Sequence, residues 1–400
     1  MAMAPLATTA QSNAVPSPIG GLNTRDSVDL LPETDAIRLD NFFPARSHVQ
    51  VRNGYDDHVT GLPSSVESLM VYNSGTASTM FAASGTAVYN VTSAGSVGSA
   101  VITSLTNARF QSVNMTTSGG SFLFICNGAD APRHWNGSAW ATPTLGSVTA
   151  ANIINVEVYK ERLFFVLKDS LTYGYLPVNA VAGTVASVNL GSVFSKGGKI
   201  MAIATWTRDG GAGPDDNILF FTDQGEIAMY SGTDPSDATK WGLVGVYTVG
   251  RPIGHRCMLK VGSDCYLVTE NGLLPMTQVL GTGEAAPNVA LSDKISSSYN
   301  SSVVEFKGTF GWQGVVYPKG GYAAVNAPAS TVGDFIQYII NLETGAWSRF
   351  TNQDAYVWAV FNSDLYFGGS TKVYKADSGT DDSGSAIEAV AKTAFIYFGG

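Results

Sequence analysis

Cysteine, basic charge and long apolar runs are all scarce in this chain of 400 residues. The three cysteines, Cys126, Cys257 and Cys265, are too few for a disulfide framework and fit a protein made in a reducing cytoplasm. No run approaches the roughly 18 apolar residues of a membrane helix. The N-terminus lacks the basic and apolar regions of a secretory signal, so we expect neither membrane insertion nor export by that route.

Basic residues are outnumbered, with 23 Lys and Arg against 32 Asp and Glu and a net charge of −9. Nucleic-acid binding is dominated by Lys and Arg that neutralise phosphates. The charge balance therefore argues against a surface that grips DNA or RNA, although an acidic surface could still face DNA that has to slide past without sticking.

Motifs for catalysis are also missing. The sequence has no GxSxG elbow, SxxK pair or P-loop, and none of its four histidines stands in an HExxH frame. His255, Cys257 and Cys265 could bind a soft metal, but their spacing matches no standard zinc pattern, and buried structural cysteines are the favoured interpretation.

An acidic stretch from Asp377 to Gly384 resembles a calcium loop only superficially. Glu388 falls at the twelfth position, but no glycine holds the sixth place and no helical pattern flanks the stretch, which favours a solvated turn. We therefore predict no catalytic residue, no cofactor and no metal, and a protein that is not an enzyme.

What the sequence does contain is a recurring pair of short strands, an apolar run followed by a second strand that often ends near an aromatic residue. The pair returns about seven times between residues 69 and 377, in steps of 41 to 56 residues; the apolar runs contain Phe81, Phe122, Leu163, Leu219, Tyr266, Tyr322 and Leu365. Repeats of roughly 40 to 50 residues, each able to supply about four strands, are typical of a β-propeller. We predict an all-β fold, a propeller of about seven blades, over a sandwich of hairpins that would show much of the same alternation.

The chain divides into four predicted regions. Residues 1–17 read as a mobile arm, 18–60 as an extended N-terminal segment, 61–385 as the propeller and 386–400 as a C-terminal strand that suggests a continuing chain. Within the propeller, residues 207–217 read as a loop. The one short helix is expected around 291–295, with Asn288 or Ser292 as N-cap.

The N-terminal segment is predicted either to lie over the propeller, closing a blade, or to contact a neighbouring subunit. It mixes arginines with aromatic residues, which are the types enriched at protein interfaces. The candidate subunit interface consists of Arg25, Arg38, Phe42, Phe43, Arg46, Arg52 and Tyr55.

Part of this segment resembles a known family. The runs at 18–23, 26–27, 31–32, 35–36, 39–44 and 51–55, together with 290–295 and 374–387, resemble virion proteins of short-tailed bacteriophages that form the tail nozzle or tail tube. The resemblance implies a homo-oligomeric ring of β-propeller subunits, six in number, within the virion tail. It also implies portal-adaptor and tail fibre or spike proteins as partners, and genome DNA that passes through without tight binding.

The leading interpretation is therefore a structural tail protein. Two alternatives remain open: a carbohydrate-binding or carbohydrate-cleaving propeller that recognises the host surface, and a protein-interaction propeller. The first alternative predicts a monomer with a central pocket lined by aromatic residues, because aromatic faces stack on sugars.

Overall fold

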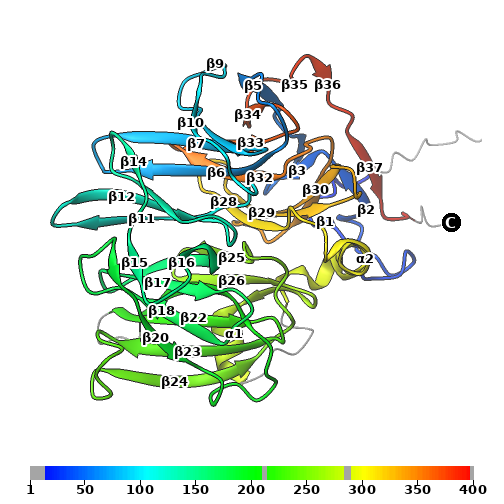
Figure 1. Ribbon diagram of the computed structural model, residues 1–400. Coiled ribbons are helices and arrows are strands. Elements are labelled where there is room, and N and C mark those ends of the chain that lie inside the picture. The colour runs from blue at the N-terminus through cyan, green and yellow to red at the C-terminus, as the bar shows by residue number, and fades with distance from the viewer. Residues whose placement is uncertain (1–13, 210–213, 283–289, 397–400) are drawn as a thin grey trace, which may run out of the picture.

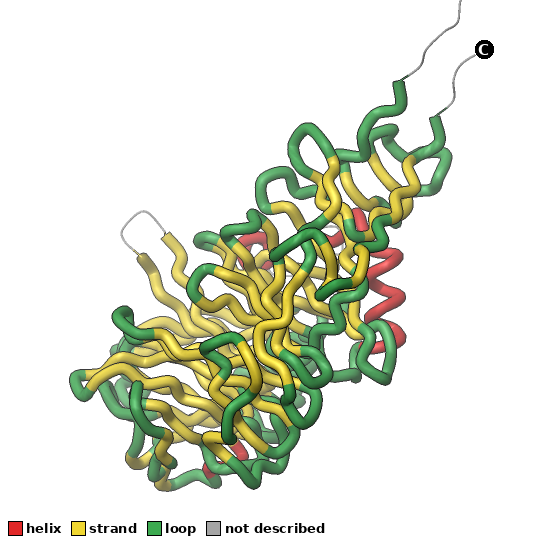
Figure 2. The backbone as a smooth tube through the Cα atoms, turned by 90° about the horizontal axis from the view of Figure 1, so that it is seen from above, coloured by secondary structure: helices red, strands yellow, loops and turns green. Residues whose placement is uncertain are grey.

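The computed structural model describes residues 14–209, 214–282 and 290–396, and Figures 1 and 2 show that strands dominate this part of the chain. Successive segments of the chain form successive small sheets, as the colours in Figure 1 make visible. Among the described helices, none has the length and apolar character needed to cross a membrane.

Four blades are four-stranded antiparallel sheets built from consecutive strands. The first contains β6 (Val66–Asn73), β7 (Ser78–Ser84), β8 (Ala87–Asn90) and β10 (Ala100–Ile102), and the second contains β11 (Gln111–Thr117), β12 (Gly120–Cys126), β13 (Arg133–Trp135) and β14 (Trp140–Ala141). The third contains β16 (Ile153–Tyr159), β17 (Arg162–Leu167), β18 (Thr172–Tyr175) and β20 (Ala186–Asn189). The fourth contains β21 (Ile200–Asp209), β22 (Pro214–Thr222), β23 (Glu226–Gly232) and β24 (Trp241–Thr248).

A fifth blade has three strands, β25 (Met258–Val261), β26 (Asp264–Thr269) and β27 (Gly272–Pro275), and is followed by helical turns. These are α1 (Met276–Thr282), which the sequence analysis missed, a 3-10 turn at Leu291–Ile295 and α2 (Ser296–Phe306). Ser292 is not an N-cap, because it lies within the 3-10 turn, whose N-cap is Ala290; its hydroxyl accepts a hydrogen bond from the Leu273 backbone N–H at 3.0 Å. Asn288, the other proposed cap, lies outside the described residues.

The remaining two large sheets have seven strands each and combine distant parts of the chain. One runs in the order β28 (Gln313–Tyr317), β29 (Tyr322–Pro328), β30 (Phe335–Asn341), β31 (Trp347–Phe350), β1 (Gly21–Leu22), β2 (Asp35–Asp40) and β37 (Val390–Thr393). The other contains β32 (Val357–Phe361), β33 (Asp364–Gly368), β34 (Val373–Ala376), β5 (Tyr55–Thr60), β35 (Asp381–Asp382) and β36 (Ser385–Ala386), with β9 (Gly95–Ser96) beside β5. Two small pairs complete the described strands, β3 (Phe42–Pro44) with β4 (Val49–Val51) and β15 (Leu145–Gly146) with β19 (Gly183–Thr184).

The predicted β-propeller fold class is confirmed, but the expected blade count is not: five blades stand as separate sheets of three or four strands, where about seven were predicted. The last two repeats form part of the two seven-stranded sheets, here called the composite sheets. Strands from both ends of the chain pair along the outer edges of these repeats, which would otherwise expose unpaired backbone groups. The segment 18–60 supplies β1, β2 and β5 to these sheets, and the boundary drawn after residue 60 follows directly on β5. β37, from the region 386–400, pairs with β2.

Residues 207–217 are not a loop. β21 and β22 extend through this stretch up to the four residues 210–213, which lie outside the described part of the chain.

The core lies between neighbouring sheets. Phe165, Phe220 and Leu365 are buried as their apolar strands predict, and the Phe220 ring stacks on that of Tyr173 with centroids 4.4 Å apart. Phe122 is only partly buried, in an edge contact with His134. The first strands of successive sheets, β6, β11, β16, β21, β25, β28 and β32, surround a common centre, and β32 contacts β6.

Candidate functional site

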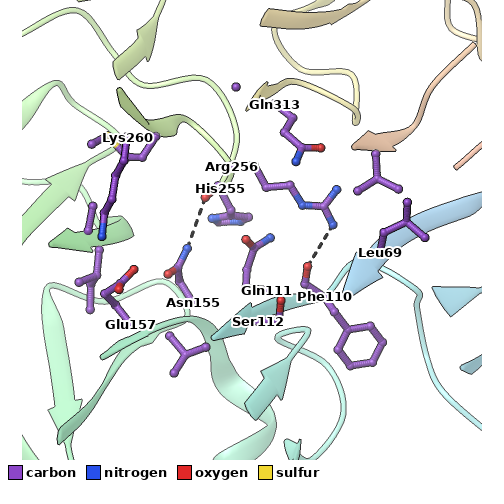
Figure 3. A pocket seen from close by; sticks show the side chains of 16 residues that line it. Leu69, Phe110, Gln111, Ser112, Asn155, Glu157, His255, Arg256, Lys260 and Gln313 are labelled. Carbon is purple, nitrogen blue, oxygen red and sulfur yellow. Dashed lines mark hydrogen bonds between the residues drawn. The ribbon is translucent and has the colours of Figure 1, made fainter. Parts of the chain in front are cut away.

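The centre of the molecule holds a cavity of about 270 Å³, here called the central cavity. Its lining comes from or beside the first strand of every large sheet, and polar side chains dominate it (Figure 3). They are Gln111, Ser112, Asn155, Glu157, His255, Arg256, Lys260 and Gln313.

Hydrogen bonds join the walls of the central cavity across sheet boundaries. The Gln313 amide donates to the Trp358 carbonyl at 2.9 Å and accepts from the Trp358 backbone N–H at 2.9 Å, which ties β28 to β32. Lys260 donates to the Thr205 hydroxyl at 2.6 Å. Burial raises the pKa of the nearby Glu157 carboxyl, against the opposing effect of Lys260. The lining of the central cavity therefore contains both acidic and basic side chains and is not purely acidic.

Arg256 precedes β25 and reaches across to the first two blades. Its Nη2 donates to the Glu67 carbonyl at 2.9 Å, the Ser68 hydroxyl at 2.8 Å and the Phe110 carbonyl at 3.0 Å. The other terminal nitrogen, Nη1, is buried and has no hydrogen-bond partner in the described structure. Burial lowers the pKa of the guanidinium to about 10, with Glu67 and Arg109 acting in opposite directions, so Arg256 remains a cation at neutral pH.

A second cavity of about 300 Å³, here called the mouth cavity, adjoins the first and shares Gln111, His255 and Arg256 with it. Arg109 and Phe310 also line it. The Phe310 ring contacts two cations, with its centroid 4.3 Å from the Arg109 guanidinium carbon and 5.4 Å from that of Arg256. Such contacts favour a planar guanidinium over an aromatic face.

The Glu67 carboxylate pairs directly with Arg109, one of these two cations. Glu67 Oε1 accepts from Arg109 Nε and Nη2, both at 3.1 Å. His255 Nδ1 donates to the Met201 carbonyl at 2.7 Å, and burial lowers the pKa of the imidazole, which is therefore neutral at pH 7. The mouth cavity thus holds two arginines against a single carboxylate.

The seven residues predicted as a subunit interface have partners within the chain. Arg52 is buried and pairs with Asp382 through bonds of 2.8 and 2.6 Å, and Tyr55 packs edge-on against Phe367 and Tyr374. Arg38 pairs with Asp40, which Arg349 also contacts; burial raises the pKa of this carboxyl, but the hydrogen bonds from both arginines outweigh it and the net shift is downward. The other four residues are half-buried or exposed: Phe42 and Phe43 pack at the edge of the core, Arg25 pairs with Asp26 and Asp293, and Arg46 with Glu343.

The candidate metal ligands lie in different surroundings. Cys257 and Cys265 are buried in the core, where burial raises the pKa of each thiol to about 12, whereas His255 lines the cavities. In the acidic stretch, Asp382 is the partner of Arg52. Across residues 14–209, 214–282 and 290–396, no cluster of three or more His, Cys, Asp or Glu side chains could hold a metal ion.

A second surface feature is the outer strand of the fourth blade. β24 has eight residues and ends its sheet, with no described strand paired to its outer side. Three aliphatic side chains on it are exposed, Leu243 at 46%, Val244 at 49% and Val246 at 38%. The outer strands β10, β14 and β20 are much shorter, at three, two and four residues.

Sequence reasoning found neither the two arginines at the mouth cavity nor Phe310. They come from three separate loops at 109, 256 and 310, and no local pattern joins them. The position of β24 at a sheet edge could not be predicted either, because it depends on which strands the rest of the chain leaves uncovered.

No protein-family model matches this chain, and no curated protein does. A solved structure of BBS1N in complex with ARL6DN, soaked with lead, aligns with a TM-score of 0.50 at 10% identity, over 83% of this chain and 99% of that chain. The WD40 β-propeller domain of Doa1 aligns with a TM-score of 0.49 at 12% identity, over 80% of this chain and 96% of that chain. At these identities the likeness concerns the fold alone; the β-propeller assignment rests on the small sheets arranged around the central cavity.

Proposed function

We propose that this protein is a non-enzymatic propeller that acts by binding other protein subunits and assembles with copies of itself into a ring. The observation that carries the proposal is β24, a long outer strand with a free backbone edge and three exposed aliphatic side chains. Free edges of this kind pair readily with other chains, and soluble proteins usually keep them short, charged or covered. A partner strand or subunit would cover β24.

The setting we propose is the tail of a short-tailed bacteriophage, in the virion, where such a ring would form part of the nozzle. The support is the resemblance carried by residues 18–55, 290–295 and 374–387, together with the acidic balance that would let DNA pass. In this setting the adaptor below the portal and the fibre or spike proteins would be its further partners. The exposed ion pair of Arg46 with Glu343 lies on the surface available to them.

We also propose that the two composite sheets act as the sixth and seventh blades of the propeller. The support is that β28 and β32 line the central cavity beside the first strands of the five separate blades.

The carbohydrate alternative predicts a central pocket lined by aromatic residues. Phe110 is the one phenylalanine, tyrosine or tryptophan among the residues that line the central cavity, so this alternative is not the one we propose.

The test is the oligomeric state of the full chain, measured by size-exclusion chromatography with light scattering and by negative-stain imaging. We expect a ring that the double variant Val244→Lys, Val246→Lys dissociates, because charged side chains block edge pairing. Val304→Lys is the matched control, since Val304 on α2 is 81% exposed and far from the β24 edge in sequence. A parent chain that stays monomeric at its highest soluble concentration would contradict the proposal.

A further inference from the structure

The hairpin between β13 and β14, at the outer edge of the second blade, contains the Asn-Gly pair Asn136–Gly137. In such a pair the glycine nitrogen can attack the asparagine side-chain carbon and close a succinimide ring, and glycine has no Cβ to hinder the approach. The chain contains other Asn-Gly pairs, which are Asn53–Gly54, Asn127–Gly128 and Asn271–Gly272. In a folded protein, the reactivity of each pair depends on whether its glycine nitrogen is accessible and free of hydrogen bonds.

The fold restrains the glycine in each of these other pairs. The Gly54 N–H donates to the Gly379 carbonyl at 3.2 Å, and the Gly128 N–H donates to the Ile153 carbonyl at 3.0 Å. Gly272 belongs to β27 and takes part in its pairing with β26. All three glycines are buried. Attack by their nitrogens therefore requires that the structure first open locally.

The hairpin pair is different in both respects. Asn136 and Gly137 are exposed, and the Gly137 N–H has no acceptor within the described part of the chain. The Asn136 Oδ1 accepts from the backbone N–H of Ser138 at 3.0 Å and of Ala139 at 2.8 Å, and from the Ser138 hydroxyl at 3.0 Å. Donors placed at a carbonyl oxygen stabilise the negative charge that develops there when a nucleophile attacks the carbon. The turn therefore places an activated amide beside an accessible backbone nitrogen.

We propose that Asn136 is a site of spontaneous deamidation in the folded protein. The Gly137 nitrogen forms a bond to the Asn136 Cγ and gives up its proton, the bond from Cγ to Nδ2 breaks, and Nδ2 leaves with that proton as ammonia. Solvent water then opens the succinimide to aspartate or isoaspartate. No electrons are transferred to or from another reagent, and the protein gains one negative charge.

The product would alter the hairpin in which it forms. Isoaspartate adds a carbon atom to the backbone between Trp135 and Trp140, which stand opposite each other in the β13–β14 ladder. Their rings have centroids 5.6 Å apart, and both contact the Phe81 ring edge-on. A longer turn would shift one tryptophan relative to the other, so the modification should also change tryptophan fluorescence.

The test is peptide mapping by mass spectrometry of the folded full chain, sampled over time at mildly alkaline pH, which favours loss of the amide proton. We expect the Asn136 peptide to acquire the mass of the acid about fivefold or more faster than the peptides of the other Asn-Gly pairs. That factor corresponds to one backbone hydrogen bond of ordinary strength. In the urea-unfolded chain, the Asn-Gly pairs should react at similar rates, because the protection by the fold is lost.

Asn136→Gln is the control variant, since its longer side chain closes a larger ring more slowly, and it should remove the product and its ammonia. Three results would overturn the inference. They are no product at Asn136 in the folded chain, equal rates at all the Asn-Gly pairs of the folded chain, or an equal lead of Asn136 in the unfolded chain, which would assign the reactivity to local sequence. The readout follows bonds within one chain, so it does not depend on ring assembly through β24.

Discussion

Two arginines, Arg52 and Arg256, show how differently a buried guanidinium can be accommodated. Arg52 donates to the Asp382 carboxylate, the Asn41 side chain and the backbone carbonyls of Asn53 and Thr351, so each of its nitrogens has an acceptor. Arg256 faces carbonyls and a hydroxyl with one nitrogen and nothing with the other. Arg52 thus has an acceptor for every nitrogen, whereas Arg256 keeps one nitrogen buried without any.

Loss of the Arg52 side chain should therefore weaken the fold severely. Arg52→Ala leaves Asp382 buried without its partner, and breaking a buried pair from one side costs about 3 to 5 kcal/mol of unfolding free energy. Denaturant unfolding measures the loss. Arg46→Ala is the control, because its pair with Glu343 is exposed on both sides and such pairs contribute about 0 to 1 kcal/mol. Equal unfolding midpoints for the two variants would show that the Arg52 network is not structural.

At the scale of elements, the local sequence predicted where many strands lie, but it often did not predict which strands pair with one another. The continuous apolar runs that contain Phe165 and Phe220 predicted β17 and β22, and each of these strands pairs with a hairpin partner close in sequence. By contrast, β1 lies beside β31, with Gly21 opposite Trp347, and Arg52 meets Asp382 across 330 residues. No periodicity encodes pairing at such separations. The two arginines at the mouth cavity escaped prediction for the same reason.

Gly54 lies where the backbone of the N-terminal segment packs tightly against that of the C-terminal region. A Cβ atom placed there would lie 1.7 Å from the Asp381 carbonyl oxygen, which belongs to the backbone and cannot swing aside. Gly54→Ala should therefore force β5 and β35 apart and lower the unfolding free energy by about 1 to 3 kcal/mol, the usual range for overpacking. Thermal unfolding gives the readout. Gly98→Ala is the control, since nothing lies within 4 Å of its added Cβ; an unchanged melting temperature in Gly54→Ala would mean that the two strands separate without cost.

At the scale of the whole molecule, charge governs how the protein meets DNA. With 23 Lys and Arg against 32 Asp and Glu, we expect the isolated protein to bind duplex DNA weakly or not at all, even at low salt. The cations of the mouth cavity are too few to change this, since each neutralised phosphate requires its own cation. Fluorescence anisotropy with a labelled duplex measures the affinity. Micromolar or tighter binding that weakens steeply with salt would replace a passive conduit with a DNA-gripping role.

The pairing of β2 with β37 has a mechanical consequence. The two strands run antiparallel, and Thr393, the residue of β37 nearest the C-terminal end, stands opposite Ala36 at one end of the ladder. A force applied to the C-terminal end would therefore break this ladder one residue pair at a time, beginning at Thr393. The rest of the sheet would bear little of that load until β37 had detached, so β37 would be the first strand lost under such a force.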